Sequence, residues 1–265
     1  MKFYFITFCH NKSFEKYSIT MKLVKQIYPD SICYMYTAED LPKEINDYAD
    51  LYPRGYGYYL WKPYIILQKL NEISDNDIIL YADSRCHIKG KCNWLEDLIQ
   101  NIEYDIAHTS TFYPECYFTR KDLFSELNKI YNIDNNDIDK ILNSHQHMAT
   151  FMAIRKNNKT IDFIKNWYIF MNNNKQLIND LNKKELEIER KSVSYNNYFR
   201  ENRHDQSVFS VLIKIYNKYN LLNIRYIENK DIPQGNLIAH CSGRGSQLPF
   251  CKNCWKNIKY CNCDK

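Results

Sequence analysis

Short apolar segments and amphipathic segments alternate through the first half of the chain, and this alternation restricts the fold more than any other feature. Residues 2–8, 31–37, 77–83 and 104–110 are apolar enough to form buried strands. Between them, apolar residues recur every three or four positions, as in the segment 61–72, which predicts helices. Strands that alternate with helices are typical of right-handed crossovers and a mainly parallel sheet. We therefore predict an α/β fold in which helices flank a mainly parallel sheet.

The second half of the chain continues this pattern with one interruption. A strand and two buried helices are predicted after Met148. Residues 172–203 are polar and rich in Asn, without a long apolar stripe, so we expect a surface excursion or a lid there. No internal repeat or linker divides the chain. One domain over residues 1–245 is therefore predicted, followed by a short Cys-rich tail over residues 246–265.

The composition is that of a soluble globular protein, with 265 residues, 45% hydrophobic residues and 25% charged residues. The net charge of +5 is modest and the basic residues are scattered, so nucleic acid is not an expected partner. No apolar run approaches the roughly 20 residues that span a bilayer, so no transmembrane segment is expected. The first ten residues lack the small-residue cleavage site of a signal peptide. Half of the 10 cysteines are dispersed without a framework spacing, and we expect a cytoplasmic protein with reduced thiols.

The strand predicted over residues 77–83 ends in three polar residues, Asp83, Ser84 and Arg85. In open α/β sheets, ligands bind beyond the carboxyl ends of the strands. A carboxylate in that position can bind a divalent metal or accept hydrogen bonds from a ribose. It can equally cap a turn or a helix, and this segment alone supports both interpretations.

A second candidate segment precedes that strand, where a loop leads into the helix predicted from Trp61. Gly55 and Gly57 are the only glycines among the first 89 residues, which indicates a tight turn or a close approach to a ligand. Arg54 and Lys62 flank the start of the helix, and a helix N-terminus with basic side chains suits a phosphate group. The alternative is a Tyr-rich surface loop with packed aromatic side chains.

Together these segments resemble a known family of enzymes. The combination of GYGYYLWKPYIILQKL, DIILYADS, RHDQSVFSVL and IAHCSGRG is similar to glycosyltransferases of the GT-A fold that use nucleotide sugars, in particular to poorly characterised bacterial and viral transferases. The resemblance extends from Met1 to about Gly245, and residues from about Asn172 to Glu201 contribute nothing to it. It implies a Rossmann-like mixed sheet.

The resemblance also implies a donor site. In these enzymes an Asp-x-Asp motif at a strand end holds Mn²⁺ or Mg²⁺, and its first position matches Asp83 while its second would be Arg85. Either a weakly held metal is bound by Asp83 and His240, or Arg85 neutralises the diphosphate without a metal. The donor, a UDP- or GDP-sugar, is expected to contact the following residues: Thr7, Phe8, Arg54, Tyr59, Lys62, Asp83, Ser84, Arg85 and Gly243.

For catalysis, the matching Asp-Gln pair of these enzymes faces the reaction centre. Asp205 would bind acceptor hydroxyl groups or act as general base, and His204 is the second candidate base. Gln206 and His147 would contact the acceptor. The alternative for Asp205 is a helix cap.

The Cys-rich tail suggests a separate, structural site. Cys251, Cys254, Cys261 and Cys263 could hold a structural Zn²⁺, although the gap between the two pairs is short. Oxidised pairs and a disordered basic tail are the alternatives.

We therefore predict a hexosyltransferase-type glycosyltransferase that moves a sugar from a nucleoside diphosphate to a hydroxyl group of a glycan or protein acceptor. The competing hypothesis is a degenerate domain of the same fold that binds nucleotide sugars or glycans without turnover.

Overall fold

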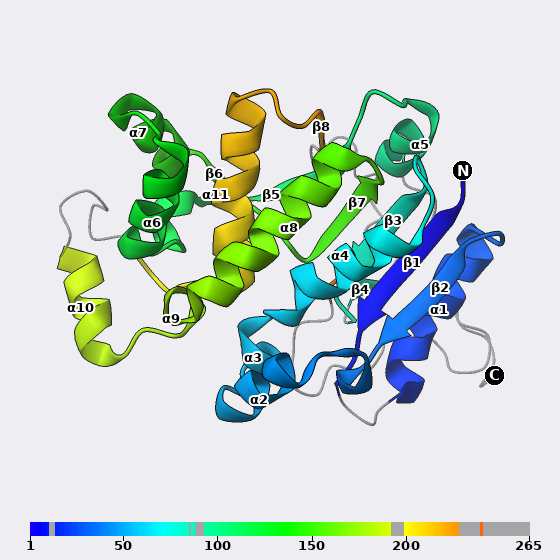
Figure 1. Cartoon of the computed structure of the whole chain (residues 1–265), viewed down its shortest axis with the longest axis horizontal. Coiled ribbons are helices and arrows are strands. Elements are labelled where there is room, and N and C mark those ends of the chain that lie inside the picture. Colours follow the sequence, from blue (N-terminus) through cyan, green and yellow to red (C-terminus); the bar gives the residue numbers. More distant parts are fainter. Residues whose placement is uncertain (11–13, 85, 88–92, 192–198, 228–238, 241–265) are drawn as a thin grey trace, which may run out of the picture.

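A seven-stranded mixed sheet forms the centre of the molecule, and helices cover both of its faces (Figure 1). The computed structural model describes residues 1–10, 14–84, 86–87, 93–191, 199–227 and 239–240. The strands of the sheet are β1 (Phe3–Phe8), β2 (Ile32–Tyr36), β3 (Ile78–Ala82), β5 (Ile106–Pro114), β6 (His145–His147), β7 (Phe151–Arg155) and β8 (Ile224–Ile227). A second, two-stranded ladder pairs β4 (Cys86–His87) with β9 (Ala239–His240).

The sheet is mainly parallel, as the alternation of strands and helices predicts. Its order is β2-β1-β3-β7-β5-β6, and β8 pairs with β5. β1 is parallel to β2 and β3, and β8 is parallel to β5. β7 runs antiparallel to both β3 and β5, so β3 and β5 point in the same direction. The carboxyl ends of β1, β3 and β5 therefore lie at the same edge of the sheet.

The helices divide into two layers around the sheet. The longer ones are α1 (Phe14–Ile27), α2 (Lys43–Leu51), α4 (Trp61–Glu72), α5 (Asn93–Gln100), α6 (Lys121–Tyr131), α7 (Asn135–Asn143), α8 (Asn158–Asn173), α10 (Lys183–Lys191) and α11 (His204–Lys218). Short turns are η1 (Ala38–Asp40), α3 (Gly55–Tyr58), η2 (Glu115–Tyr117) and α9 (Lys175–Ile178). No helix among the described residues is long and apolar enough to cross a membrane.

The alternation of side chains along the buried strands creates the two cores. Tyr81 of β3 faces the same side as residues of α4, α8 and α11, whereas Leu80 faces the side of α1 and α5. Because successive side chains of a strand point to opposite faces, a strand covered on both sides has to be apolar throughout. All five residues of β3 are buried, which explains the unbroken apolar run in this part of the sequence.

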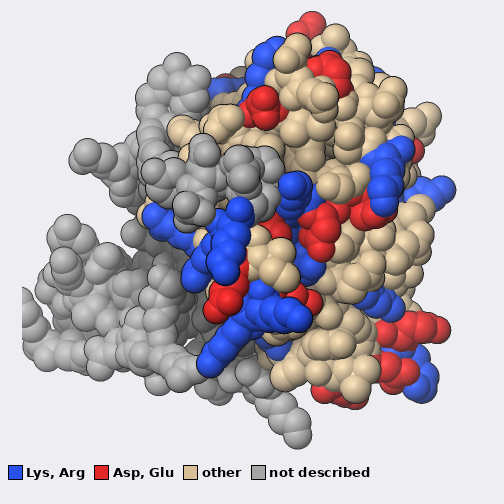
Figure 2. Space-filling view, turned by 90° about the vertical axis from the view of Figure 1, so that its left-hand side faces the viewer, with Lys and Arg blue, Asp and Glu red and all other residues tan. Residues whose placement is uncertain are grey.

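The segment predicted as a surface excursion is partly packed. Leu177 and Ile178 of α9 are buried, and the Asn202 side chain donates a hydrogen bond of 2.9 Å to the Leu177 carbonyl. α10 has no buried residue. It lies at the edge of the molecule, on a face where basic and acidic side chains are mixed (Figures 1 and 2).

A left-handed turn precedes α4 and fixes where that helix begins. Five consecutive residues, Gly55 to Tyr59, have positive φ angles between 50° and 77°. Backbone hydrogen bonds close the turn, from the Tyr58 amide to the Arg54 carbonyl and from the Tyr59 amide to the Gly55 carbonyl. Left-handed backbone costs a non-glycine residue about 1–2 kcal/mol, and three of the five residues are tyrosines. Their packing against the core and the two glycines make the turn possible.

We expect Gly57→Ala to lower the free energy of unfolding by about 1–2 kcal/mol, because alanine disfavours the φ of +77° found there. A Cβ atom at this position would also lie 3.2 Å from the Ala49 Cα atom of α2. Thermal and urea unfolding measure the change, with Asp50→Ala on the exposed side of α2 as the control. Unchanged stability of Gly57→Ala would contradict the strained turn.

Candidate functional site

The Lys62 side chain joins two carboxylates at the carboxyl edge of the sheet. Its Nζ atom lies 2.6 Å from Asp205 Oδ2 and 3.2 Å from Asp83 Oδ1, and it donates a hydrogen bond of 3.2 Å to the Ala149 carbonyl. Lys62 lies in the first turn of α4, Asp83 directly follows β3, and Asp205 lies in the first turn of α11. Three segments that are distant in the sequence therefore meet at one ammonium group.

This cluster is nearly closed to water on one side and open on the other. The Lys62 and Asp205 side chains are only 3% and 5% exposed, whereas 22% of the Asp83 side chain is exposed. Aromatic rings surround the ammonium group, with the Tyr59 centroid at 5.0 Å and the Tyr81 centroid at 5.4 Å. The Tyr81 hydroxyl donates a hydrogen bond to Asp83. Asp83 is therefore the most exposed member of the cluster.

Burial and charge act in opposite directions on the ionisation of these groups. Burial raises the pKa of Asp205 to about 6, although the Lys62 ammonium acts to lower it. For Lys62, burial acts to lower the pKa, but the carboxylates of Asp205 and Asp83 outweigh it and the net shift is upward. At neutral pH the Lys62 ammonium is therefore charged and most of Asp205 is ionised.

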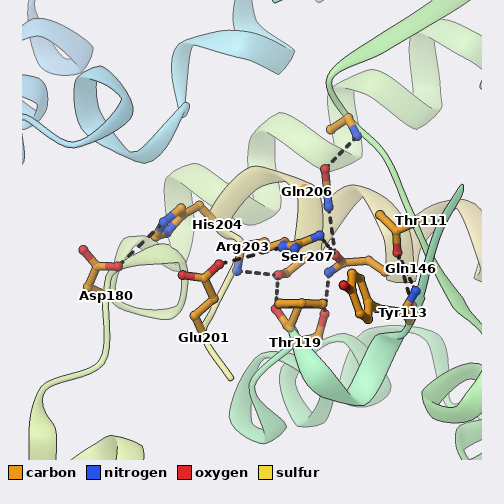
Figure 3. A network of polar contacts seen from close by, with 12 residues as sticks. Thr111, Tyr113, Thr119, Gln146, Asp180, Glu201, Arg203, His204, Gln206 and Ser207 are labelled. Atoms are coloured by element: carbon orange, nitrogen blue, oxygen red, sulfur yellow. Dashed lines mark hydrogen bonds and ion pairs between the residues drawn. The ribbon is translucent and has the colours of Figure 1, made fainter. Parts of the chain in front are cut away.

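A chain of polar contacts extends from this cluster along the start of α11 (Figure 3). Gln206 Oε1 accepts a hydrogen bond of 3.4 Å from the Ala149 amide. The carbonyl of the same residue, Ala149, accepts the hydrogen bond from Lys62. Gln206 Nε2 donates a bond of 2.8 Å to Gln146 Oε1, which also accepts from Arg203 Nη1 at 3.4 Å. Gln146 in turn donates to the buried Glu115 at 3.2 Å. The amide groups of Gln146 and Gln206 thus connect the Lys62 cluster to the charged side chains of Arg203 and Glu115.

His204, the second predicted base, lies beside the cluster in a packed position. Its ring stands 4.7 Å from the Tyr58 ring and 6.2 Å from the Tyr59 ring, measured between centroids. Its Nδ1 atom lies 2.6 Å from the Ile178 carbonyl, and burial lowers its pKa. His204 has a φ angle of +52°. These contacts fix the start of α11 and the Tyr59 ring next to Lys62.

Three other predicted residues lie further from the ammonium group or are buried. Arg54 is half exposed and forms an ion pair of 2.5 Å with Asp180. His147 is buried, with its ring centroid 4.6 Å from that of His108, and burial lowers its pKa. The Phe8 ring stacks on Trp61 at 4.0 Å. Among the described residues, none of these three side chains forms a hydrogen bond or ion pair with Lys62, Asp83 or Asp205.

Thr7 and Ser84 lie near the ends of neighbouring strands. Thr7 belongs to β1, and its buried hydroxyl has no hydrogen-bond partner among the described residues. Ser84 follows Asp83 directly and is half-buried. Since β1 and β3 are parallel neighbours, both residues are positioned at the edge that carries Asp83.

The two predicted metal ligands, Asp83 and His240, both lie among the described residues. Among them, no three His, Cys, Asp or Glu side chains form a cluster that could hold a metal ion. The backbone of His240 is paired with Cys86, whose amide donates a bond of 2.8 Å to the Asp83 carbonyl. His240 and Asp83 thus belong to neighbouring stretches of backbone, and the negative balance of the cluster fits a cation. Arg85, Gly243 and the four predicted zinc ligands, Cys251, Cys254, Cys261 and Cys263, lie outside the described residues.

Several residues of the site were not predicted from the sequence. Tyr81, Gln146, Ala149 and Arg203 contribute contacts through their tertiary positions. Only Tyr81 could have been suspected from the sequence. It places a polar hydroxyl group in an otherwise aliphatic strand, close to the polar residues at the end of that strand. Arg203 begins the RHDQSVFSVL segment and Gln146 and Ala149 lie near His147, but nothing in the sequence assigns these three residues a contact.

No protein-family model matches this chain, and no curated protein matches it. Among solved structures, it is similar to a glycosyltransferase involved in glycosylation of the major capsid of PBCV-1, with 10% identity, 65% of this chain and 67% of that chain covered, and a TM-score of 0.36. It is similar to the galactosyltransferase LgtC in complex with donor and acceptor sugar analogues, with 12% identity, 95% and 90% covered, and a TM-score of 0.37. Mouse xyloside xylosyltransferase 1 gives 8% identity, 86% of each chain covered, and a TM-score of 0.43. All three of these proteins are glycosyltransferases.

We expect the Asp205 carboxyl group to titrate with a midpoint near pH 6, because burial disfavours its charged form. Lys62→Met should move this midpoint upward, since it removes the ammonium group that favours the carboxylate. Carboxyl carbon NMR of the wild type and the variant measures both values, and Lys43→Met, which changes an exposed residue of α2, is the control. A midpoint near 4 in the wild type would contradict the burial of Asp205.

Proposed function

We propose that this protein transfers a sugar from a nucleoside diphosphate sugar to a hydroxyl group of an acceptor. The observation that carries the proposal is the buried Lys62 ammonium, which joins Asp83 and Asp205 at the carboxyl edge of the sheet. Ligands of open α/β sheets bind at this edge. Carboxylates held in fixed positions are suited to accept hydrogen bonds from sugar hydroxyl groups, and the partly exposed Asp83 is placed to contact the donor.

A diphosphate can bind beside this negatively charged cluster only if an additional positive charge is supplied. One ammonium and two carboxylates carry an excess of negative charge, which repels another anion. Mn²⁺ or Mg²⁺ held by Asp83 and His240 would supply the positive charge that the departing nucleoside diphosphate needs; Arg85 could supply it in place of a metal. Thr7, Tyr59 and Ser84 would line the donor side of the site.

Asp205 is the candidate base in this proposal. Lys62 fixes its carboxylate, and a pKa of about 6 leaves it mostly ionised at neutral pH while it remains basic enough to accept a proton. As the acceptor oxygen bonds to the anomeric carbon and the bond to the phosphate oxygen breaks, the hydroxyl proton passes to this carboxylate. Gln206 would orient the acceptor through its amide group.

The proposal is tested by incubating the protein with UDP- and GDP-sugars, simple glycoside acceptors and Mn²⁺, and measuring release of the nucleoside diphosphate. A parallel reaction with a chelator in place of Mn²⁺ shows whether a metal ion or Arg85 supplies the positive charge, because only the metal-dependent reaction would stop. Donor binding without release under every condition would instead support the binding-module hypothesis.

We expect Asp83→Asn and Asp205→Asn each to reduce release by at least about 100-fold, the usual contribution of a general base or of a charged group at the reacting centre. Asp205→Asn keeps the shape of the side chain and leaves Lys62 its ion pair with Asp83, so the variant should stay folded although its melting temperature falls. Asp47→Asn, an exposed carboxylate on α2, is the matched control. Normal release with a large loss of stability in Asp205→Asn would leave Asp205 as a helix cap only.

A further inference from the structure

Two arginines stand over a group of aromatic rings next to the start of α11. The Arg200 guanidinium lies 4.9 Å from the Tyr113 ring centroid and 5.1 Å from that of Tyr117. The Arg203 guanidinium lies 3.4 Å from the Phe118 centroid. The three rings also contact one another, with centroids 5.6–6.3 Å apart. We call these five residues the arginine–aromatic patch.

The patch holds its arginines in fixed positions and leaves one of them open to solvent. Arg200 is exposed, and its own amide donates a bond of 2.8 Å to the Tyr117 carbonyl. The Tyr113 side chain is also 41% exposed. A guanidinium stacked on aromatic rings keeps its N–H groups directed outward in the plane, which is the geometry that binds a carboxylate or phosphate with two hydrogen bonds.

The charges around the patch are not balanced within the described residues. Burial lowers the pKa of Arg203, and the Arg200 charge adds to this effect. Glu201 is the acidic group beside Arg203, at 4.0 Å, and it also pairs with Arg54 at 3.7 Å. Among the described residues Arg200 forms no ion pair. Among the described residues Glu201 is the only ion-pair partner of these two guanidinium groups, and of the two it contacts only Arg203, so the pair of like charges favours the binding of an additional anion.

The position of the patch connects it to the candidate active site. Tyr113 lies near the carboxyl end of β5, which points in the same direction as β3, so the patch and Asp83 share one edge of the sheet. Arg203 is two residues from Asp205, which places their Cα atoms within about 7 Å of each other. Hydrogen bonds through Gln146 and Gln206 link Arg203 to Ala149, whose carbonyl accepts a hydrogen bond from Lys62 (Figure 3).

We propose that the arginine–aromatic patch is an acceptor subsite for an acidic sugar, whose carboxylate or phosphate binds Arg200 and Arg203. This inference rests on the proposed function, since the sugar would be part of the acceptor. The exposed Tyr113 ring offers an apolar face to the sugar ring, and Arg200 binds its anionic group. Since Gln146 links Arg203 to Gln206, the neighbour of Asp205, the acidic sugar is the glycosylated residue or its neighbour.

The test is a binding measurement that does not need turnover. Methyl hexosides of gluco, galacto and manno configuration, the corresponding methyl hexuronides and the hexoside 6-phosphates are titrated into the full-length protein by calorimetry. We expect at least one acidic member to bind about tenfold more tightly than its neutral counterpart, as a charge-assisted hydrogen bond contributes. Comparing uronides with phosphates identifies which anionic group the subsite prefers.

Variants identify the residues that produce this preference. Arg200→Gln should abolish it without weakening binding of the neutral hexosides, and Arg200→Lys should restore only part of it, because an ammonium cannot form the planar pair of bonds. Lys43→Gln, an exposed cation on α2, is the matched control. Equal affinity for neutral and acidic sugars, or a preference that survives in Arg200→Gln, overturns the subsite.

The same variants separate this inference from the proposed function. If nucleoside diphosphate is released but neutral acceptors serve as well as acidic ones and Arg200→Gln has no effect, the subsite is wrong and the transferase remains. If acidic sugars bind through Arg200 but no donor is turned over, the subsite stands as a binding site and the transferase is wrong.

Discussion

The buried ammonium group of Lys62 is the interaction on which the rest of the site depends. Taking a charge out of water costs several kcal/mol, and the cost is offset here by two carboxylates, a backbone carbonyl and aromatic rings. Because the partners come from β3, α11 and the loop before β7, the ammonium ties three segments to the start of α4. Removing any one charged partner would leave an uncompensated charge, which typically costs about 3–5 kcal/mol. The site is therefore part of what holds the fold together.

Much of the fold could be predicted because its central strands are covered on both faces. Apolar runs such as residues 78–82 can only be buried strands once helices alternate with them, and the structure confirms the mainly parallel sheet. The direction of β7 could not be predicted. Phe151 to Arg155 are all buried, and a strand with this pattern looks the same in either direction. The left-handed turn could not be predicted either. Two glycines indicate a turn, but they do not show that the neighbouring tyrosines also adopt positive φ angles.

For the site, sequence identified the charged residues but not their arrangement. Asp83 stood out as a strand end and Lys62 as a basic residue at a helix start, yet their contact depends on the left-handed turn that places α4. Arg54 and Lys62 were predicted to act together on a phosphate, but Lys62 is buried between carboxylates whereas Arg54 pairs with Asp180. Arg203 lies in the RHDQSVFSVL segment and Gln146 lies beside the predicted acceptor residue His147, but their contact could not be predicted, since a side-chain amide or guanidinium gains its role only from the partners that tertiary structure provides.

The two halves of the site place different physical demands on a ligand. Around Lys62 the charges are buried and satisfied by one another, so a ligand gains affinity there only by bringing a compensating charge or hydrogen bonds to Asp83. Around Arg200 the positive charge is exposed and held by aromatic rings, so a negative group binds it at little reorganisation cost. Gln146 and Gln206 lie between the halves and carry no charge. A neutral hydroxyl group is therefore the chemistry best suited to the space between them, with an anionic group on the Arg200 side.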